Sequence, residues 1–463
     1  MSQDIAEADA LIWRAYGEMV KNFFLAGSNG LQEGLDYIYV CPPTEHGIRG
    51  GSPIPDAVTN FNISTFADSL QRADSPLFMP GAELSYFESL KVYLNAARVR
   101  DITPSQKEEI QQAIQEARNL ETQRDARRND AVARWEADTD ARRNHTSFRR
   151  WAVANAQSYL QSDREAKLAA GQVRQLQSRY YGAAADTLTD KLLKLDNLAG
   201  DDLQSNPGYN MPCYIRDYKI DETALEEGRR VEGLPGDDLV YRPLYVIDGY
   251  ESACDDWIRG TDRNNFVWNL NLIQSRHNDW TDLGHSTNAS RRGSSFFFFF
   301  SKSSASSSTE THLNFTGADW KENTSIALTM KGPVKAFNLS AGLWDVPGVR
   351  RLFPHLLDGE TDTALGLVRA HKILVGYQVA FKIKFAESLR TQVRNMLIEA
   401  RSDATSGLRI FGFQFGRDTG SKTSFTRDIN SLSYNESTNE ISAPESPEGC
   451  PVLLGVLGRK ITA

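Results

Sequence analysis

The chain has 463 residues, enough for two or three domains, and its hydrophobic content of 40% and charged content of 24% are ordinary for a globular protein. Its formal net charge of −8 argues against general nucleic-acid binding, which needs an excess of clustered Lys and Arg. No run of about eighteen residues is apolar enough to cross a bilayer as a helix.

Residues 1–100 are predicted to form a helical and loop-rich N-terminal region. Residues 2–26 place apolar side chains at helical spacing, whereas residues 35–82 are rich in Pro and Gly and suggest loops. The chain starts with acidic residues and lacks the basic start of a secretory signal. Its four cysteines form no CxxC pair, which favours a reducing compartment. We therefore expect a cytoplasmic protein, with unconventional release as the alternative.

Residues 101–198 are predicted to form a long, coiled-coil-like helical hairpin. Thr103 and Pro104 are a typical helix start, and no further Pro or Gly follows before residue 143. A second helix begins near Phe148, which gives two antiparallel helices of about forty residues each. Between Pro104 and Arg150 there are ten basic and nine acidic residues, and apolar residues are few on the first helix, so we expect other subunits to contribute to its packing.

Residues 199–240 are predicted to form a turn-rich linker, and residues 241–463 an antiparallel β-rich domain. Apolar and polar residues alternate from Tyr377 to Phe385, and the segments around Leu328 and Phe413 show the same period of two. The sequence therefore predicts an α+β fold, with an N-terminal helical region and hairpin followed by the β-rich domain.

A Phe/Ser-rich segment at residues 294–311 is the most unusual feature of the chain. Side chains on a strand alternate between its two faces, so five consecutive phenylalanines cannot all enter one core. One interpretation is a segment that contacts a membrane or a partner. The other is an aromatic core strand followed by a serine linker. The candidate contact residues are Phe296, Phe297, Phe298, Phe299 and Phe300.

Two further patterns give weak indications of ligand binding. Residues 416–423 resemble a phosphate-binding loop but miss the GxxxxGK[ST] spacing, and no helix is expected after them, so a β-turn is the better interpretation. Four residues could supply metal ligands, without any recognised metal-binding spacing: His277, His285, Cys41 and His46. We expect no cofactor and identify no catalytic residue.

The leading functional expectation is a non-catalytic, self-associating protein, hence a homo-oligomer. Its helices would mediate assembly, and its Phe/Ser-rich segment would contact a membrane or a partner in a pore-forming-like manner. The alternative is an enzyme or binding protein for a hydrophobic small molecule, with the phenylalanine cluster lining a pocket. The sequence leaves open whether the protein is an enzyme, and nucleic acid is not expected as a partner.

Overall fold

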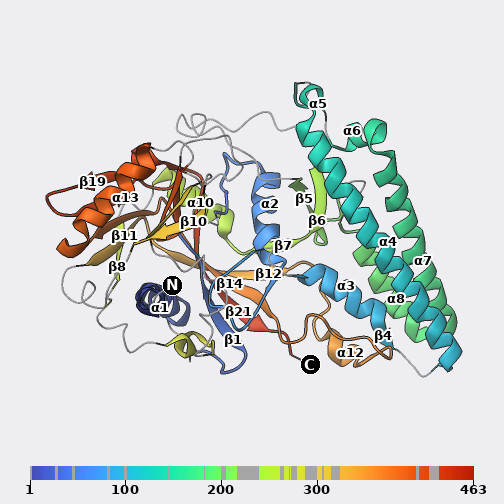
Figure 1. The fold of residues 1–463 in the computed structure, drawn as a ribbon. Helices are drawn as coiled ribbons and strands as arrows, with labels where there is room; N and C mark the ends of the chain where they lie inside the picture. Colours follow the sequence, from blue (N-terminus) through green and yellow to red (C-terminus); the bar gives the residue numbers. More distant parts are fainter. Residues whose placement is uncertain are drawn as a thin grey trace.

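The computed structural model describes residues 3–26, 30–43, 47–80, 84–98, 102–143, 146, 148–181, 183–199, 205–215, 239–260, 265–270, 272, 279–286, 300–304, 307–313, 324–402, 406–416 and 427–462. The α+β class is confirmed: a body of antiparallel sheets lies beside a group of long helices (Figure 1). None of the described helices is both long and apolar enough to cross a membrane.

The central sheet joins the two ends of the chain. Its strand order is β1-β21-β14-β12-β7, with β2 and β3 beside β14, and every pairing is antiparallel. Its strands are β1 (Asp36–Val40), β2 (Ser69–Gln71), β3 (Leu84–Ser85), β7 (Tyr245–Ile247), β12 (Lys335–Ala341), β14 (Val368–Gly376) and β21 (Val452–Lys460). The N-terminal region is therefore part of the same sheet as the C-terminal strand.

Two five-stranded sheets complete the β-rich body, and two strand pairs lie outside them. One sheet contains β8 (Asn265–Leu270), β11 (Ser325–Lys331), β15 (Ala380–Lys384), β19 (Ser433–Asn435) and β20 (Glu440–Ala443). The other contains β9 (Phe300–Ser304), β10 (Ser307–His312), β16 (Ser406–Ile410), β17 (Phe413–Gly416) and β18 (Arg427–Asp428), the last two in parallel. The pairs are β4 (Ala97–Arg98) with β13 (His355–Leu356), and β5 (Asn210–Tyr214) with β6 (Leu239–Pro243).

Helix α1 (Gln3–Leu25) lies against the sheets (Figure 1). It packs into an apolar core of the body that we call the first core, which includes Trp13, Tyr16, Trp268, Phe300 and Phe381. The Trp13 ring stacks on Phe411 at a centroid distance of 5.1 Å, and the Tyr16 hydroxyl donates to the Leu454 carbonyl at 2.8 Å. A Cβ at Gly455 would lie 2.3 Å from Cγ1 of Val20, so the glycine allows this close approach of helix and strand. The other body helices are α2 (Asp56–Ala67), α3 (Tyr86–Ala96), α10 (Tyr250–Arg259), α12 (Val349–Leu352) and α13 (Arg390–Ser402).

The predicted hairpin forms what we call the arm, which comprises α4 (Pro104–Ala137), α5 (Thr139–Arg143), α6 (Phe148–Asn155), α7 (Gln157–Tyr181) and α8 (Ala183–Asp196). The predicted start of α4 is confirmed, because Thr103 and Gln106 form a capping box and Pro104 occupies the first turn. Helices α4 and α7 run side by side (Figure 1). They have 34 and 25 residues, which is shorter than the predicted forty, because α5 and α6 turn the chain at the tip.

The arm has two apolar cores, one at its base and one at its tip. The base core contains Ile110, Ile114, Ala117, Ala169, Val173, Tyr181 and, from the body, Leu357. The tip core contains Ala131, Trp135, Ala141, Phe148, Trp151, Ala152, Ala156 and Tyr159. Between them, α4 has no buried residue from Glu121 to Asp130. The apolar surface that is scarce in the sequence of α4 is supplied within the chain, by the tip aromatics and by Leu357.

Residues 35–82 are more regular than predicted, because β1, α2 and β2 lie within them. Strand β5 likewise lies inside the predicted linker, while residues 216–238 of that linker lie outside the described residues. The strands are too short to show a clear period in the sequence. Strand β1 pairs with the distant β21, and β2 pairs with the distant β14 as well as with the nearby β3.

Candidate functional site

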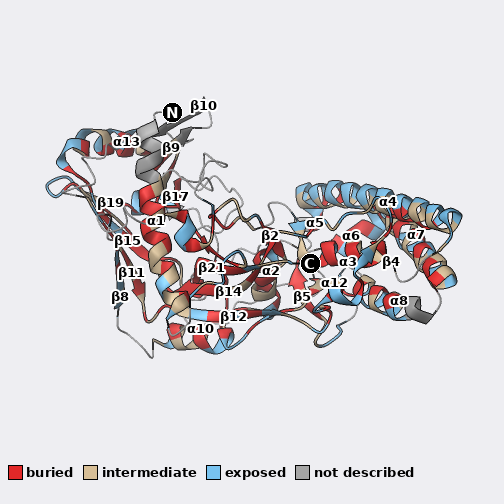
Figure 2. Cartoon of the chain, turned by 90° about the horizontal axis from the view of Figure 1, so that it is seen from below, coloured by how far each residue is buried: buried red, intermediate tan, exposed pale blue. Residues whose placement is uncertain are grey.

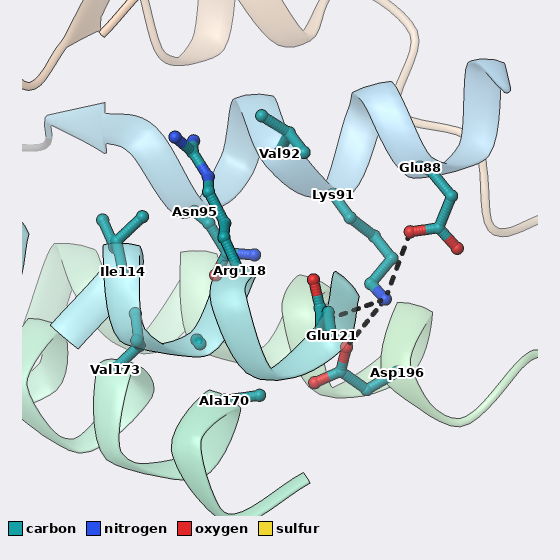
Figure 3. Close-up of a pocket in the computed structure, with 11 residues that line it drawn as sticks. Glu88, Lys91, Val92, Asn95, Ile114, Arg118, Glu121, Ala170, Val173 and Asp196 are labelled. Carbon is teal, nitrogen blue, oxygen red and sulfur yellow. Dashed lines mark ion pairs between the residues drawn. The ribbon is translucent and has the colours of Figure 1, made fainter. Parts of the chain in front are cut away.

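The most distinctive polar site lies where the arm meets α3. Lys91 extends from α3 toward three carboxylates that come from two arm helices and from its own helix (Figure 3). Its Nζ lies 3.5 Å from Asp196 Oδ1, 3.6 Å from Glu88 Oε2 and 4.0 Å from Glu121 Oε1. The Lys91 side chain is only 12% exposed, so these carboxylates replace most of its hydration.

Local sequence signals place each member of this cluster, which we call the Lys91 cluster (Lys91, Glu88, Glu121 and Asp196). Helix α3 begins after Ser85, whose hydroxyl accepts from the backbone N–H of Glu88 at 3.0 Å. Lys91 follows Glu88 by three residues, so both side chains lie on one face of the helix. Glu121 comes from the section of α4 without buried residues, and Asp196 from the last residue of α8. The polar middle of the arm thus meets the buried lysine.

The electrostatics of the cluster favour a permanently charged lysine. Burial opposes the charge of Lys91, but Glu88, Asp196 and Glu121 together outweigh burial and raise its pKa above the usual value. Burial also raises the pKa of Glu121, and repulsion from Glu88 and Asp196 adds to this shift against the attraction of Lys91. A nucleophilic lysine needs the opposite shift, toward a free amine. The ion pairs of Lys91 can hold α3 against α4 and α8, but they do not activate the lysine amine for covalent chemistry.

A small cavity lies beside the cluster and is lined by Lys91, Asn95, Arg118, Glu121, Val173 and Asp196, among others (Figure 3). Its volume of about 30 Å³ has room for no more than a few water molecules. A hydrophobic ligand of ordinary size needs several hundred Å³. This cavity is therefore a small gap between helices and not a pocket for a small organic molecule.

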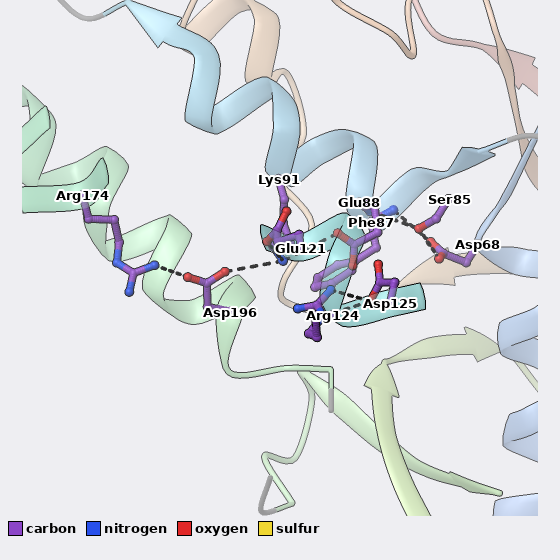
Figure 4. A network of polar contacts seen from close by, with 10 residues as sticks. All are labelled: Asp68, Ser85, Phe87, Glu88, Lys91, Glu121, Arg124, Asp125, Arg174 and Asp196. Carbon is purple, nitrogen blue, oxygen red and sulfur yellow. Dashed lines mark hydrogen bonds and ion pairs between the residues drawn. The ribbon is translucent and has the colours of Figure 1, made fainter. Parts of the chain in front are cut away.

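Polar contacts continue from the Lys91 cluster into both the arm and the body (Figure 4). On the arm side, Arg174 of α7 forms an ion pair with Asp196. On the body side, Asp68 accepts from the Ser85 hydroxyl at 2.5 Å and from the Phe87 N–H at 2.9 Å. The Tyr245 hydroxyl also donates to Asp68 at 2.5 Å, and burial raises the pKa of this carboxyl despite the three hydrogen bonds. Helix α3 is thus held at its start by the body and in its middle by the arm.

A second connection is made by the segment that follows α12, residues 355–362, which we call the strap. Strand β13 of the strap pairs with β4, and the Leu357 side chain is 1% exposed in the base core of the arm. Lys107 lies 2.8 Å from Asp358, and Arg118 lies 3.0 Å from Glu360. The strap therefore joins the arm to the body by an apolar contact flanked by two ion pairs.

The phenylalanine tract is only partly within the described residues. Phe300 is 1% exposed in the first core of the body, with its ring 6.0 Å from that of Phe385. This burial agrees with the core-strand interpretation for that residue. Residues 296–299 lie outside the described residues, so the predicted membrane or partner contact stays a prediction for them.

The candidate metal ligands are not brought together in the described part of the chain. The His285 ring is buried, with Nδ1 3.0 Å from the Ala73 carbonyl oxygen and Nε2 2.8 Å from that of Ile38. Cys41 is buried and forms no disulfide in the described part of the chain, and His277 and His46 lie outside the described residues. Among the described residues, no group of three or more His, Cys, Asp or Glu side chains is arranged to hold a metal ion.

Sequence reasoning did not find the Lys91 cluster. One signal was present: ten consecutive residues of α4, from Glu121 to Asp130, contain no large apolar side chain, which indicates that this section meets something polar. The three-residue spacing of Glu88 and Lys91 was a second signal, but such pairs are common on solvated helices. Neither signal names the partner, because Asp196 lies 105 residues after Lys91 in the sequence.

Comparison with known proteins adds no family to these observations. No protein-family model, no curated protein and no solved structure matches the chain, so its function has to be argued from its own residues.

Proposed function

We propose that this chain is a non-catalytic protein that self-associates through its arm. One observation carries this proposal: α4 and α7 extend along the side of the body, and the outward side of α4 is exposed over most of its length (Figures 1 and 2). Two internal cores, the Lys91 cluster and the strap hold the arm in one position. A rigid surface of this kind is suited to binding a partner without a large ordering cost.

The chemistry of the described site supports a binding role. Lys91 is held in its charged form, and burial raises the pKa of the thiols of Cys213 and Cys254 to about 12, so neither sulfur is an activated nucleophile. The cavity beside Lys91 has room for no more than a few water molecules. A charged lysine, buried neutral thiols and a cavity of this size give no support to turnover of a substrate.

Sedimentation velocity of the full chain over a wide concentration range tests self-association directly. We expect the sedimentation coefficient to rise with concentration as larger species form. A chain that stays monomeric at every concentration would contradict the proposal.

The finer part of the proposal concerns residues 296–299 of the phenylalanine tract, which we expect to contact a membrane or a partner in a pore-forming-like manner. Dye release from liposomes should fall when Phe297→Ser and Phe299→Ser are combined. The matched control combines Leu343→Ser with Leu352→Ser, which removes apolar surface at positions that are 71% and 54% exposed. Equal leakage from both variants would exclude a specific role of the tract. No leakage from any form, together with a lipophilic molecule that copurifies, would favour the alternative of a hydrophobic-ligand carrier.

A further inference from the structure

The outward face of the first half of α4 is acidic. Between Pro104 and Ala126 the helix has five acidic and three basic residues. The basic ones are engaged at the foot of the arm or within α4: Lys107 and Arg118 bind the strap, and Arg124 pairs with Asp125 at 2.8 Å. Glu108 and Glu116 are exposed and have no ionic partner among the described residues. The negative charge that remains therefore points to solvent.

The outward face of α7 has the opposite sign. This helix has four basic and two acidic residues, and Arg174 faces inward to Asp196. Arg164 and Arg179 are exposed, and within the described part of the chain neither forms an ion pair, although Arg179 lies over the Tyr180 ring. Lys167 is also exposed and is partly neutralised by Asp163 at 2.7 Å. Exposed Leu168, at 69%, adds an apolar contact on this face.

Within one molecule the exposed charges of Glu108 and Glu116 are not paired with those of Arg164 and Arg179, because α4 and α7 meet through the arm cores and through contacts of other residues, such as Tyr180 with Glu109. Each arm therefore presents an acidic face on the first half of α4 and a basic face on α7. Opposite charges on rigid helices guide association and fix its orientation.

We infer that the partner of the arm is a second copy of this chain, with the acidic face of α4 from one molecule against the basic face of α7 from the other. In a two-fold dimer this contact forms twice, because each molecule gives one face and receives the other. The inference rests on the proposed self-association and specifies its surface and its partner.

A charge-swap experiment on the full chain tests this inference by sedimentation equilibrium. The first variant is Glu108→Lys/Glu116→Lys, and the second is Arg164→Glu/Arg179→Glu. None of these four residues has an ion pair within the described chain, so the changes break no internal salt bridge. Each variant alone should dimerise about a hundredfold more weakly than the wild type, since both contacts become repulsive. High salt should weaken the wild-type dimer as well.

Mixing the two variants should restore dimers, because both contacts of the mixed dimer then join opposite charges. The chain that carries all four changes should also dimerise alone, for the same reason. The matched control for the second variant is Arg351→Glu/Lys384→Glu, which makes the same change of charge at exposed positions of the body and should leave the dimer intact.

The outcomes separate the two proposals. A wild-type chain that is monomeric at all concentrations contradicts the proposed function and the inference together. A wild-type oligomer that both charge variants leave unchanged contradicts the inference alone and leaves self-association through another surface. Weakening in both variants without recovery in the mixture also contradicts the pairing of α4 with α7.

Discussion

His285 and Ile38 are joined by a short contact inside the body: Nε2 of the imidazole lies 2.8 Å from the Ile38 carbonyl oxygen. The other ring nitrogen lies 3.0 Å from the Ala73 carbonyl oxygen. A neutral imidazole can donate from only one nitrogen, so one of these two oxygens then receives no hydrogen bond from the ring. The rings of Tyr37 and Tyr39 pack on the imidazole at 5.5 Å and 5.0 Å and exclude water from it.

The free energy of unfolding should depend on pH partly through the protonation of His285. Burial lowers the pKa of His285 below 6.5, against the opposing effects of the two carbonyl groups and of Asp74. Below about pH 6.5 the unfolded chain therefore takes up a proton that the folded chain does not. The free energy of unfolding should fall as the pH is lowered from 6.5 through the folded pKa. Urea titrations of the wild type and His285→Gln, at a series of pH values, measure this.

The difference between the two proteins isolates the contribution of His285 from that of other titrating groups. The Gln variant should show a smaller loss of stability on acidification. If acidification destabilises both proteins equally, the pKa of His285 is not depressed in the folded state.

Lys91→Met should destabilise the protein by about 2 kcal/mol, because Glu88, Glu121 and Asp196 then lose their shared cation. The value is below that of a fully buried pair, because Glu88 is half-exposed and partly screened by solvent. Lowering the pH should recover part of this loss, since protonation of the carboxylates removes their repulsion. Unfolding in urea at neutral and acidic pH measures both effects.

Lys107→Met is the matched control, because Lys107 forms its ion pair with Asp358 at a more exposed place. It should cost less than about 1 kcal/mol at either pH. Equal losses of stability in the two variants would mean that the Lys91 cluster stabilises the contact of the arm with the body no more than an exposed ion pair does.

Leu357→Ala should cost about 2–4 kcal/mol, because the side chain is 1% exposed in the base core of the arm. It should also make the strap an early site of limited proteolysis, since Leu357 is its apolar anchor. Leu352→Ala, at a 54% exposed position nearby in the sequence, should be almost neutral in both assays. If the strap of Leu357→Ala is cleaved no earlier than that of the wild type, the ion pairs of Asp358 and Glu360 are sufficient to hold the strap in place.

Gly284→Ala should destabilise the protein by more than about 1 kcal/mol. Gly284 has φ of 89°, and a Cβ at this position would lie 2.3 Å from the Asp36 carbonyl oxygen. Gly359→Ala is the comparison, because its φ of 86° is similar but the Cβ of an alanine there would have no atom within 4 Å. Thermal unfolding of both variants separates the effect of steric overlap from that of backbone strain. Equal decreases in Tm would mean that the overlap with Asp36 does not contribute to the destabilisation.

Much of the local structure could be predicted from the sequence. The alternation around Leu328 and from Tyr377 to Phe385 indicated β11 and β15, and Thr103 with Pro104 indicated the start of α4. These predictions succeeded because period and capping are properties of short segments. The period at Phe413 also pointed to a strand, but the positive φ angles of Phe411 and Gly412 bend the chain before β17 begins.

The arrangement of these segments could not be predicted in the same way. Lys91 resembles a surface lysine in the sequence, and only the approach of α4 and α8 surrounds it with Glu121 and Asp196. Leu357 likewise lies in a segment with no clear period, and its role depends on the distant base core of the arm. Sites that depend on contacts between remote segments leave little trace in the residues beside them.

The pairing of β1 with β21 affects how this protein can fold during its synthesis. Arg459 donates to Asp36 at 2.9 Å across 423 residues of chain, so the central sheet is incomplete until β21 leaves the ribosome. The arm, whose helices α4 and α7 are close in the sequence, can form much earlier. The nascent chain should therefore expose the unpaired edges of β1 and β14 until β21 has been synthesised and can pair with both strands.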